Sequence, residues 1–328
     1  MKYTQFHRNE KLKTIKKDWI GNPNKRGKFQ NLSFHKKAGI SNIFKLRYRR
    51  NPDRHIKKAE KWNPYHTKIT SLEHIEEDSL MWLGHNSFFM QLDGKRFLFD
   101  PVFGHIPFVR RKSVFPAQVT AFSDIDYILI SHDHYDHLDK KSIKIIVRHS
   151  PDVKIICGLG LKKLLERWTR KSVEIIEAGW YQQYNDASIK VTFLPCRHWG
   201  KRGVNDGSVR LWGAYMVQSA KLNIYYSGDT VYGDHFGEVP GLFGNPDYAI
   251  IGIGAYKPRW FMEPNHISPY DAVRAAKDMG AKVAIPMHYG TFDLSNEPLS
   301  DPPVVFENTA QTENQRVYIP HLGETVEL

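Results

Sequence analysis

The chain contains Ser131-His132-Asp133-His134-Tyr135-Asp136-His137-Leu138, the stretch that says most about its fold. The stretch directly follows the apolar run Tyr127-Ile128-Leu129-Ile130, which has the length and composition of a buried strand. Side chains of metal-binding type, among them the four candidate ligands His132, His134, Asp136 and His137, therefore lie on the loop at the carboxyl end of a strand, where open α/β sheets usually bind their ligands. The sequence predicts a metal site on this loop.

The spacing of these four side chains favours two metal ions over one. His132 and His134 are two residues apart and can point the same way from an extended backbone, whereas Asp136 and His137 follow a turn and can face a second ion. Imidazole nitrogens with carboxylate oxygens suit zinc, with iron and manganese as alternatives. The competing interpretation is a histidine-rich polar loop without a chemical role, and the density of ligands after a buried strand argues against it.

The motif His132-x-His134-x-Asp136-His137 resembles the signature of the metallo-β-lactamase superfamily. Members of that superfamily typically complete the site with a later His, a bridging Asp and a final His, each after a further strand. The counterparts here, each after a strand-like run, are His198, Asp229 and His288. The resemblance implies that one ion is held by His132, His134 and His198, that the other is held by Asp136, His137 and His288, and that Asp229 bridges them.

A closer resemblance is to the N-acylphosphatidylethanolamine phospholipase D branch and its bacterial relatives. The matching segments lie between positions 80 and 295, and residues 1–70 match only loosely. The segments are Trp82-Leu83-Gly84-His85, Phe99-Asp100-Pro101-Val102-Phe103, the Tyr135 and Leu138-Asp139 flanks, His198-Trp199, Ser227-Gly228-Asp229-Thr230, Asn265-His266 and His288-Tyr289-Gly290-Thr291-Phe292.

The resemblance also implies roles for individual residues. Asp136 and His266 would act in catalysis, with His266 contacting the phosphate or protonating the leaving group. Independently of the resemblance, His85 and Asp100 lie at the ends of early strand-like runs, from which they could sit behind the ligands and orient the ligand histidines. The alternatives are a His266 that only hydrogen-bonds the backbone, and purely structural hydrogen bonds at His85 and Asp100.

Strand and helix patterns alternate in two similar halves, which fits an α/β fold: a four-layer αββα sandwich of metallo-β-lactamase type with a basic N-terminal extension. We expect the extension to span residues 1–70 and the hydrolase domain to span residues 71–328. The segments 81–92 and 96–99 predict a hairpin around Asp93-Gly94. Asp139 and Ser268 are the predicted N-caps of two helices.

Two cations a few ångströms apart can generate a bridging hydroxide near neutral pH, so the site predicts metal-dependent hydrolysis. The branch resemblance selects a phosphodiesterase of phospholipase D type acting on N-acylphosphatidylethanolamine-like phospholipids. The alternatives are a lactonase or a nuclease on the same fold. Only 30 residues separate His198 from Asp229 and 58 separate Asp229 from His288, too few for the large inserted domain with which many superfamily nucleases clamp RNA. The complete ligand set argues against a binding protein with a vestigial site, because a decayed site would have lost a ligand. The resemblance also argues against an oxygen-reducing diiron protein, because superfamily members of that type usually carry a carboxylate where this chain has His134.

Positive charge is concentrated at the start of the chain. Residues 1–68 hold 20 of the 47 Lys and Arg residues but only 4 of the 35 Asp and Glu residues. Such a segment is attracted to anionic lipid or nucleic acid, and aromatic residues such as Trp19 and Phe34 could insert shallowly into a membrane. We expect this segment to associate peripherally with an anionic membrane, and we expect binding to lipid rather than to nucleic acid. The alternative is a solvated extension that is partly packed on the domain.

The remaining features concern the compartment. No run of 18 apolar residues occurs, and the amino terminus lacks the apolar core of a signal peptide, so we expect a cytoplasmic protein with a membrane-associated fraction. The only two cysteines exclude a disulfide framework, and Cys196 is expected to be a small core residue rather than an added metal ligand. The sequence leaves the oligomeric state open.

Overall fold

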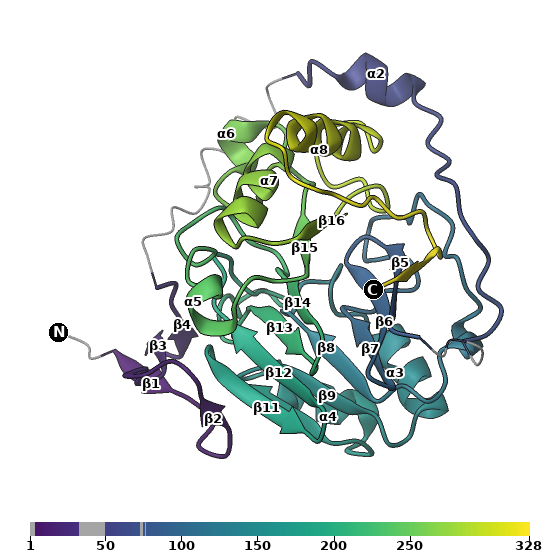
Figure 1. Ribbon diagram of the computed structural model, residues 1–328. Coiled ribbons are helices and arrows are strands. Elements are labelled where there is room, and N and C mark those ends of the chain that lie inside the picture. Colours follow the sequence, from purple (N-terminus) through teal and green to yellow (C-terminus); the bar gives the residue numbers. More distant parts are fainter. Residues whose placement is uncertain (1–3, 33–49, 73–74, 76) are drawn as a thin grey trace.

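The computed structural model describes residues 4–32, 50–72, 75 and 77–328, with two seven-stranded sheets at its centre (Figure 1). The first sheet has the order β10-β9-β8-β7-β6-β5-β17 and the second has the order β16-β15-β14-β13-β12-β11-β2. The strands of the first sheet are β5 (Ser79–Gly84), β6 (Ser87–Leu92), β7 (Lys95–Phe99), β8 (Tyr127–Ile130), β9 (Lys154–Gly158), β10 (Ile175–Ala178) and β17 (Thr325–Glu327). The strands of the second sheet are β2 (Lys13–Thr14), β11 (Gln182–Asp186), β12 (Ile189–Leu194), β13 (Ala214–Gln218), β14 (Asn223–Tyr226), β15 (Tyr248–Gly252) and β16 (Val283–Met287).

Helices cover the outer faces of both sheets (Figure 1). On the first sheet, α3 (Lys140–His149) and α4 (Lys162–Thr169) bury Ile143 and Leu165 in one apolar cluster. On the second sheet, α7 (Pro269–Asp278) packs against β15 and β16, and α8 (Asp301–Thr312) packs against α7. Between the sheets lie fully buried aromatic rings, such as those of Phe99 and Tyr226 at 4.8 Å between centroids. This layering confirms the predicted αββα sandwich.

The shorter helical segments are α2 (Arg54–Ala59), α5 (Val239–Phe243), α6 (Arg259–Met262) and the 3₁₀ turn η1 (Val119–Ala121). The two predicted N-caps are confirmed. The Asp139 carboxylate accepts a hydrogen bond from the Ser142 N–H at 2.8 Å at the start of α3, and the Ser268 hydroxyl accepts one from the Asp271 N–H at 3.2 Å at the start of α7. Because Asp139 comes two residues after His137, its cap anchors the end of the loop that carries four of the predicted ligands.

The segment 81–92 is not the single strand that the sequence predicted. It forms β5 and β6, which pair antiparallel across a tight turn at His85 and Asn86, where His85 has a φ of 54°. Both strands are buried along their whole length, so the apolar pattern continues on both sides of the turn and conceals it. The predicted hairpin around Asp93-Gly94 is confirmed as β6 and β7. The unpredicted turn carries His85 and Asn86 to the site.

The described parts of the basic extension pack on the sandwich. β2 pairs with β11 at the edge of the second sheet, while β1 (Gln5–His7), β3 (Asn22–Lys25) and β4 (Lys28–Phe29) form a small sheet of their own. Near α2, Lys57 pairs with Asp293, and the Glu60 carboxylate accepts a hydrogen bond from the Ser300 N–H at 2.9 Å. Residues 33–49, including Phe34, lie outside the described residues, and the boundary at residue 70 stays a prediction.

Among the described residues, no helix combines the length and the apolar content that a membrane-spanning helix needs.

Candidate metal centre

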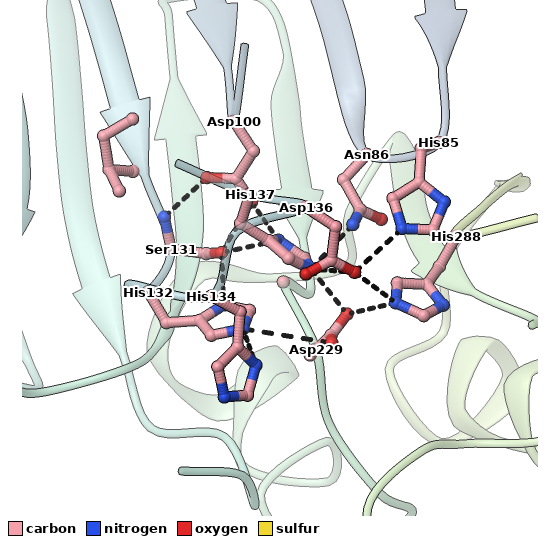
Figure 2. A network of polar contacts seen from close by, with 12 residues as sticks. His85, Asn86, Asp100, Ser131, His132, His134, Asp136, His137, Asp229 and His288 are labelled. Carbon is pink, nitrogen blue, oxygen red and sulfur yellow. Dashed lines mark hydrogen bonds and ion pairs between the residues drawn. The ribbon is translucent and has the colours of Figure 1, made fainter. Parts of the chain in front are cut away.

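The seven predicted ligand side chains lie together, in loops that follow strands of both sheets. His132, His134, Asp136 and His137 follow β8, whereas His198, Asp229 and His288 follow β12, β14 and β16. They form two groups of four that share Asp229, and within each group the candidate ligand atoms lie within 4.8 Å of one another. Figure 2 shows the shared Asp229 between His132 and His134 on one side and His288 on the other.

The first group is dominated by nitrogen. His132 Nε2 lies 2.8 Å from His134 Nδ1, and His198 Nε2 lies 3.3 Å from the same atom. Asp229 Oδ2 is 3.9 Å from His132 Nε2 and 3.6 Å from His198 Nε2. Three imidazole nitrogens and one carboxylate oxygen therefore converge on one point.

The second group holds more oxygen. Asp229 Oδ1 lies 3.1 Å from His137 Nε2 and 3.3 Å from His288 Nε2. Asp136 Oδ2 is 3.9 Å from His137 Nε2 and 3.6 Å from His288 Nε2. The two oxygens of Asp229 thus face different groups, as a bridging carboxylate requires.

The orientation of the ligand rings is set by hydrogen bonds at the nitrogen that faces away from the cluster. His198 Nδ1 donates to the Asn265 carbonyl at 3.1 Å, and His288 Nδ1 donates to the Gly254 carbonyl at 3.0 Å. When such a ring is neutral, donation from Nδ1 leaves Nε2 unprotonated, so each ring can offer its Nε2 lone pair to a cation that takes the place of a proton.

Asp100 orients the ligand rings in the loop after β8. Its carboxylate, fully buried, accepts hydrogen bonds from the Ser131 N–H at 2.7 Å, the Ser131 hydroxyl at 2.5 Å, His137 Nδ1 at 2.6 Å and the Tyr226 hydroxyl at 2.8 Å. Since the Ser131 hydroxyl donates to Asp100, it accepts from His132 Nδ1 at 3.0 Å. One carboxylate thereby orients His137 directly and His132 through Ser131 (Figure 2).

The electrostatics of the site suit a cation. Burial lowers the pKa of both His132 and His198 well below its usual range, so these rings are neutral donors. Burial opposes protonation of His288 as well, yet the Asp229 and Asp136 carboxylates raise its pKa to about 10. Asp229 Oδ2 and His288 Nε2 are buried without a hydrogen-bond partner. Converging lone pairs, buried carboxylates and unpartnered polar atoms fit the donor set of a divalent metal ion.

Two further histidines lie beside the groups. His266 Nδ1 is 3.6 Å from Asp229 Oδ2, and burial lowers its pKa to about 4. His85 Nε2 lies 3.0 Å from Asp136 Oδ2, and burial, aided by the nearby His288, lowers its pKa to about 3. His85 and Asp100 both contact predicted ligands, and His266 contacts the shared carboxylate.

Two further residues close to the candidate ligands in the sequence have structural contacts. Asp133, between two of the histidines, pairs with Arg210 at 2.6 Å and belongs to neither group of candidate ligands. The Cys196 thiol donates to the Asp229 carbonyl at 3.2 Å and is buried, in accordance with its prediction as a core residue.

Sequence reasoning missed Ser131, Tyr226 and Asn86. The Asn86 side-chain nitrogen lies 2.7 Å from His137 Nε2. Ser131 and Asn86 are the immediate neighbours of predicted site residues, and this adjacency was the available signal. Tyr226 is the last residue of β14, and no sequence signal pointed to its role.

Comparison with known proteins gives consistent similarities. A family profile described as "Beta-lactamase superfamily domain" matches residues 95–289, more than half of the chain. The N-acyl-phosphatidylethanolamine-hydrolyzing phospholipase D 1 of Caenorhabditis elegans is 34% identical over 278 residues, which cover 79% of this chain and 78% of that protein. A metal-dependent hydrolase of Caldivirga maquilingensis is 27% identical over 252 residues, which cover 76% of this chain and 97% of that protein.

Among solved structures, Igni18, a metallo hydrolase from Ignicoccus hospitalis, is similar with a TM-score of 0.58 and 19% sequence identity. The match covers 76% of this chain and 98% of Igni18. At this level of identity, the similarity concerns the fold.

Proposed function

Because the chain belongs to the metallo-β-lactamase superfamily and is a metal-dependent hydrolase, we propose that it is a two-zinc phosphodiesterase of phospholipase D type. Its substrates would be N-acylphosphatidylethanolamine-like phospholipids. The observation that carries the proposal is the pair of ligand groups joined by the two oxygens of Asp229. In this assignment His132, His134 and His198 hold one ion, and Asp136, His137 and His288 hold the other.

Two bound zinc ions would supply hydroxide near neutral pH and neutralise the negative charge of a phosphodiester. Residues of the protein orient the ligand side chains. Asp100 and Ser131 hold His137 and His132 in orientation, and His85 Nε2 donates to Asp136 Oδ2 at 3.0 Å, which fixes the direction of that carboxylate. Neither task requires these residues to touch the substrate.

His266 is the candidate for handling a proton. Its ring is partly exposed, Nδ1 lies 3.6 Å from Asp229 Oδ2, and its ring centroid is 4.9 Å from that of His288. A neutral imidazole at the edge of the cluster can hydrogen-bond a phosphoryl oxygen, or relay a proton to the departing alkoxide by releasing it from one ring nitrogen while the other takes one up from water. We assign this role to His266 and leave Asp136 the role of a ligand whose charge the reaction needs.

The choice of a phospholipid rests on similarity. The relative from C. elegans is named for the hydrolysis of N-acylphosphatidylethanolamine and covers 79% of this chain. The basic residues within 1–68 would add attraction to an anionic membrane surface, which supports the proposal of peripheral association from the cytoplasmic side. A lactonase or a nuclease on the same fold is the second candidate.

The experiment is hydrolysis in water enriched in oxygen-18, with vesicles that contain N-acylphosphatidylethanolamine. The proposal predicts release of the N-acylethanolamine, with one heavy oxygen in the phosphatidic acid, because hydroxide attacks phosphorus. Label in a released fatty acid, or activity confined to lactones or RNA in parallel assays, would overturn it. Asp229→Asn serves as the catalytically impaired control.

A further inference from the structure

Asn86 lies in the turn between β5 and β6, next to His85. It is fully buried, and its backbone carbonyl lies 2.9 Å from the Tyr226 hydroxyl. Tyr226 also donates to Asp100, so the backbone of Asn86 contacts the same network that orients His137. Figure 2 shows the Asn86 side chain pointing into the cluster from the same turn as His85.

The Asn86 carboxamide is in contact with a predicted ligand atom. Its Nδ2 lies 2.7 Å from His137 Nε2, and its Oδ1 is buried without a hydrogen-bond partner. His137 Nδ1 faces Asp100, so in a neutral ring Nε2 carries the lone pair that faces the second group. An N–H donor at that point would compete with an ion for the lone pair.

Rotation of the carboxamide by 180° exchanges its nitrogen and oxygen, a choice that the hydrogen-bond network decides. With the oxygen turned inward, an acceptor lies about as close to His137 Nε2 as neighbouring ligands of one ion, which are about 3 Å apart when each bond is about 2.1 Å and the angle is near 90°. The contact distance is therefore compatible with two donors that share an ion.

We propose that the carboxamide oxygen of Asn86 is a further ligand of the ion held by Asp136, His137 and His288. This inference rests on the proposed two-metal function and deepens it. The two ions then differ in kind: the first has three imidazoles and one carboxylate oxygen, and the second has two imidazoles and three oxygen donors. The second site has the higher coordination number and the harder ligands.

The test uses three substitutions and a matched control. Asn86→Ala removes the donor, Asn86→Leu fills a similar volume without one, and Asn86→Asp keeps an oxygen in place. Asn22→Ala is the control, because Asn22 is also fully buried and its Oδ1 accepts a hydrogen bond from the Trp180 N–H outside the cluster. Metal content after dialysis, the Kd of each ion from chelator competition and the absorption spectrum of the cobalt-substituted protein are measured.

We expect Asn86→Ala and Asn86→Leu to bind the first ion as the parent does and the second ion at least about 10-fold more weakly, the lower bound for perturbing the surroundings of a bound metal. The cobalt spectrum should change in the second site only, and Asn86→Asp should restore affinity. The inference is overturned if Asn86→Ala retains both ions with the parent's affinity and spectrum. It is also overturned if Asn86→Ala loses only thermal stability, to the same extent as Asn22→Ala.

The two levels of the proposal fail differently. A parent protein that binds only one ion contradicts the two-metal function, and the role of Asn86 fails with it. A parent that binds two ions whose affinities do not depend on Asn86 leaves the function in place and removes only the assignment of Asn86.

Discussion

Replacing Asp100 with asparagine tests whether one buried carboxylate organises the ligand loop. Oδ2 of Asp100 accepts from His137, Tyr226 and the Ser131 hydroxyl, while Oδ1 accepts from the Ser131 N–H. An asparagine keeps only one of these oxygens. Whichever way it turns, an NH₂ group faces a donor at a site that has no exposure to water.

The expected magnitude follows from that mismatch. A buried donor without an acceptor costs about 1–3 kcal/mol, and replacing a charge-assisted bond to His137 by a neutral one costs about 1 kcal/mol more. We therefore expect the free energy of unfolding of the metal-depleted protein to fall by about 2–4 kcal/mol. Because His137 loses its anchor, the affinity for the ion that it helps to hold should fall on the order of 10–100-fold.

The assays are urea unfolding of the metal-depleted protein and chelator competition for each ion. Tyr226→Phe is the matched variant, because it removes one bond to the same carboxylate, at 2.8 Å, without removing charge. It should cost about 1 kcal/mol of stability and leave metal affinity close to that of the parent. If Asp100→Asn lowers stability but leaves the affinity for both ions unchanged, then Asp100 does not position His137 and the reasoning is refuted.

Three further predictions concern other parts of the chain. Asp229→Asn should lower the retention of both ions and reduce turnover by orders of magnitude, because both carboxylate oxygens of Asp229 face ligand nitrogens. The circular dichroism spectrum should not change, and full activity with two bound ions would exclude a bridging role. Burial, with a contribution from Arg197, lowers the pKa of His235 to about 3 in the folded protein. The unfolded chain therefore binds one more proton than the folded protein below about pH 6.5, and the free energy of unfolding falls as the pH is lowered from about 6.5 to about 3. His235→Gln should remove about 2 kcal/mol of the stability lost between pH 7 and pH 5 in urea unfolding. An identical loss in both proteins would count against a neutral ring at this half-buried position. Replacing the basic residues of 33–49 with glutamine should weaken binding to anionic vesicles by up to about 1 kcal/mol each while a short soluble diester is hydrolysed at the parent rate; unchanged vesicle binding would contradict the membrane role.

The ligand loop could be predicted because its information is local. The four candidate ligands of this loop follow one strand within six positions, and the later His198, Asp229 and His288 each follow an apolar run of their own. Helix starts such as Asp139 and Ser268 were predictable for the same reason, since a cap is decided by residues three apart.

The supporting contacts were harder to predict because they join distant segments. Tyr226 and Asp100 are 126 positions apart and Asn86 and His137 are 51 positions apart, and neither pair has a periodic signature. The turn at His85 and Asn86 was concealed by strands buried on both faces. Likewise, the composition of the basic extension gave no sign that β2 would join the second sheet.

The central claim is that two ions, joined by Asp229, make the hydrolytic site, and zinc titration of the metal-depleted protein tests it most directly. Bound zinc per chain and hydrolysis of N-acylphosphatidylethanolamine in vesicles are followed in the same samples. The account predicts two zinc ions per chain in the parent, with hydrolysis appearing as the second ion binds, and loss of both in Asp229→Asn. Full hydrolysis with a single ion bound, or with none, would contradict it.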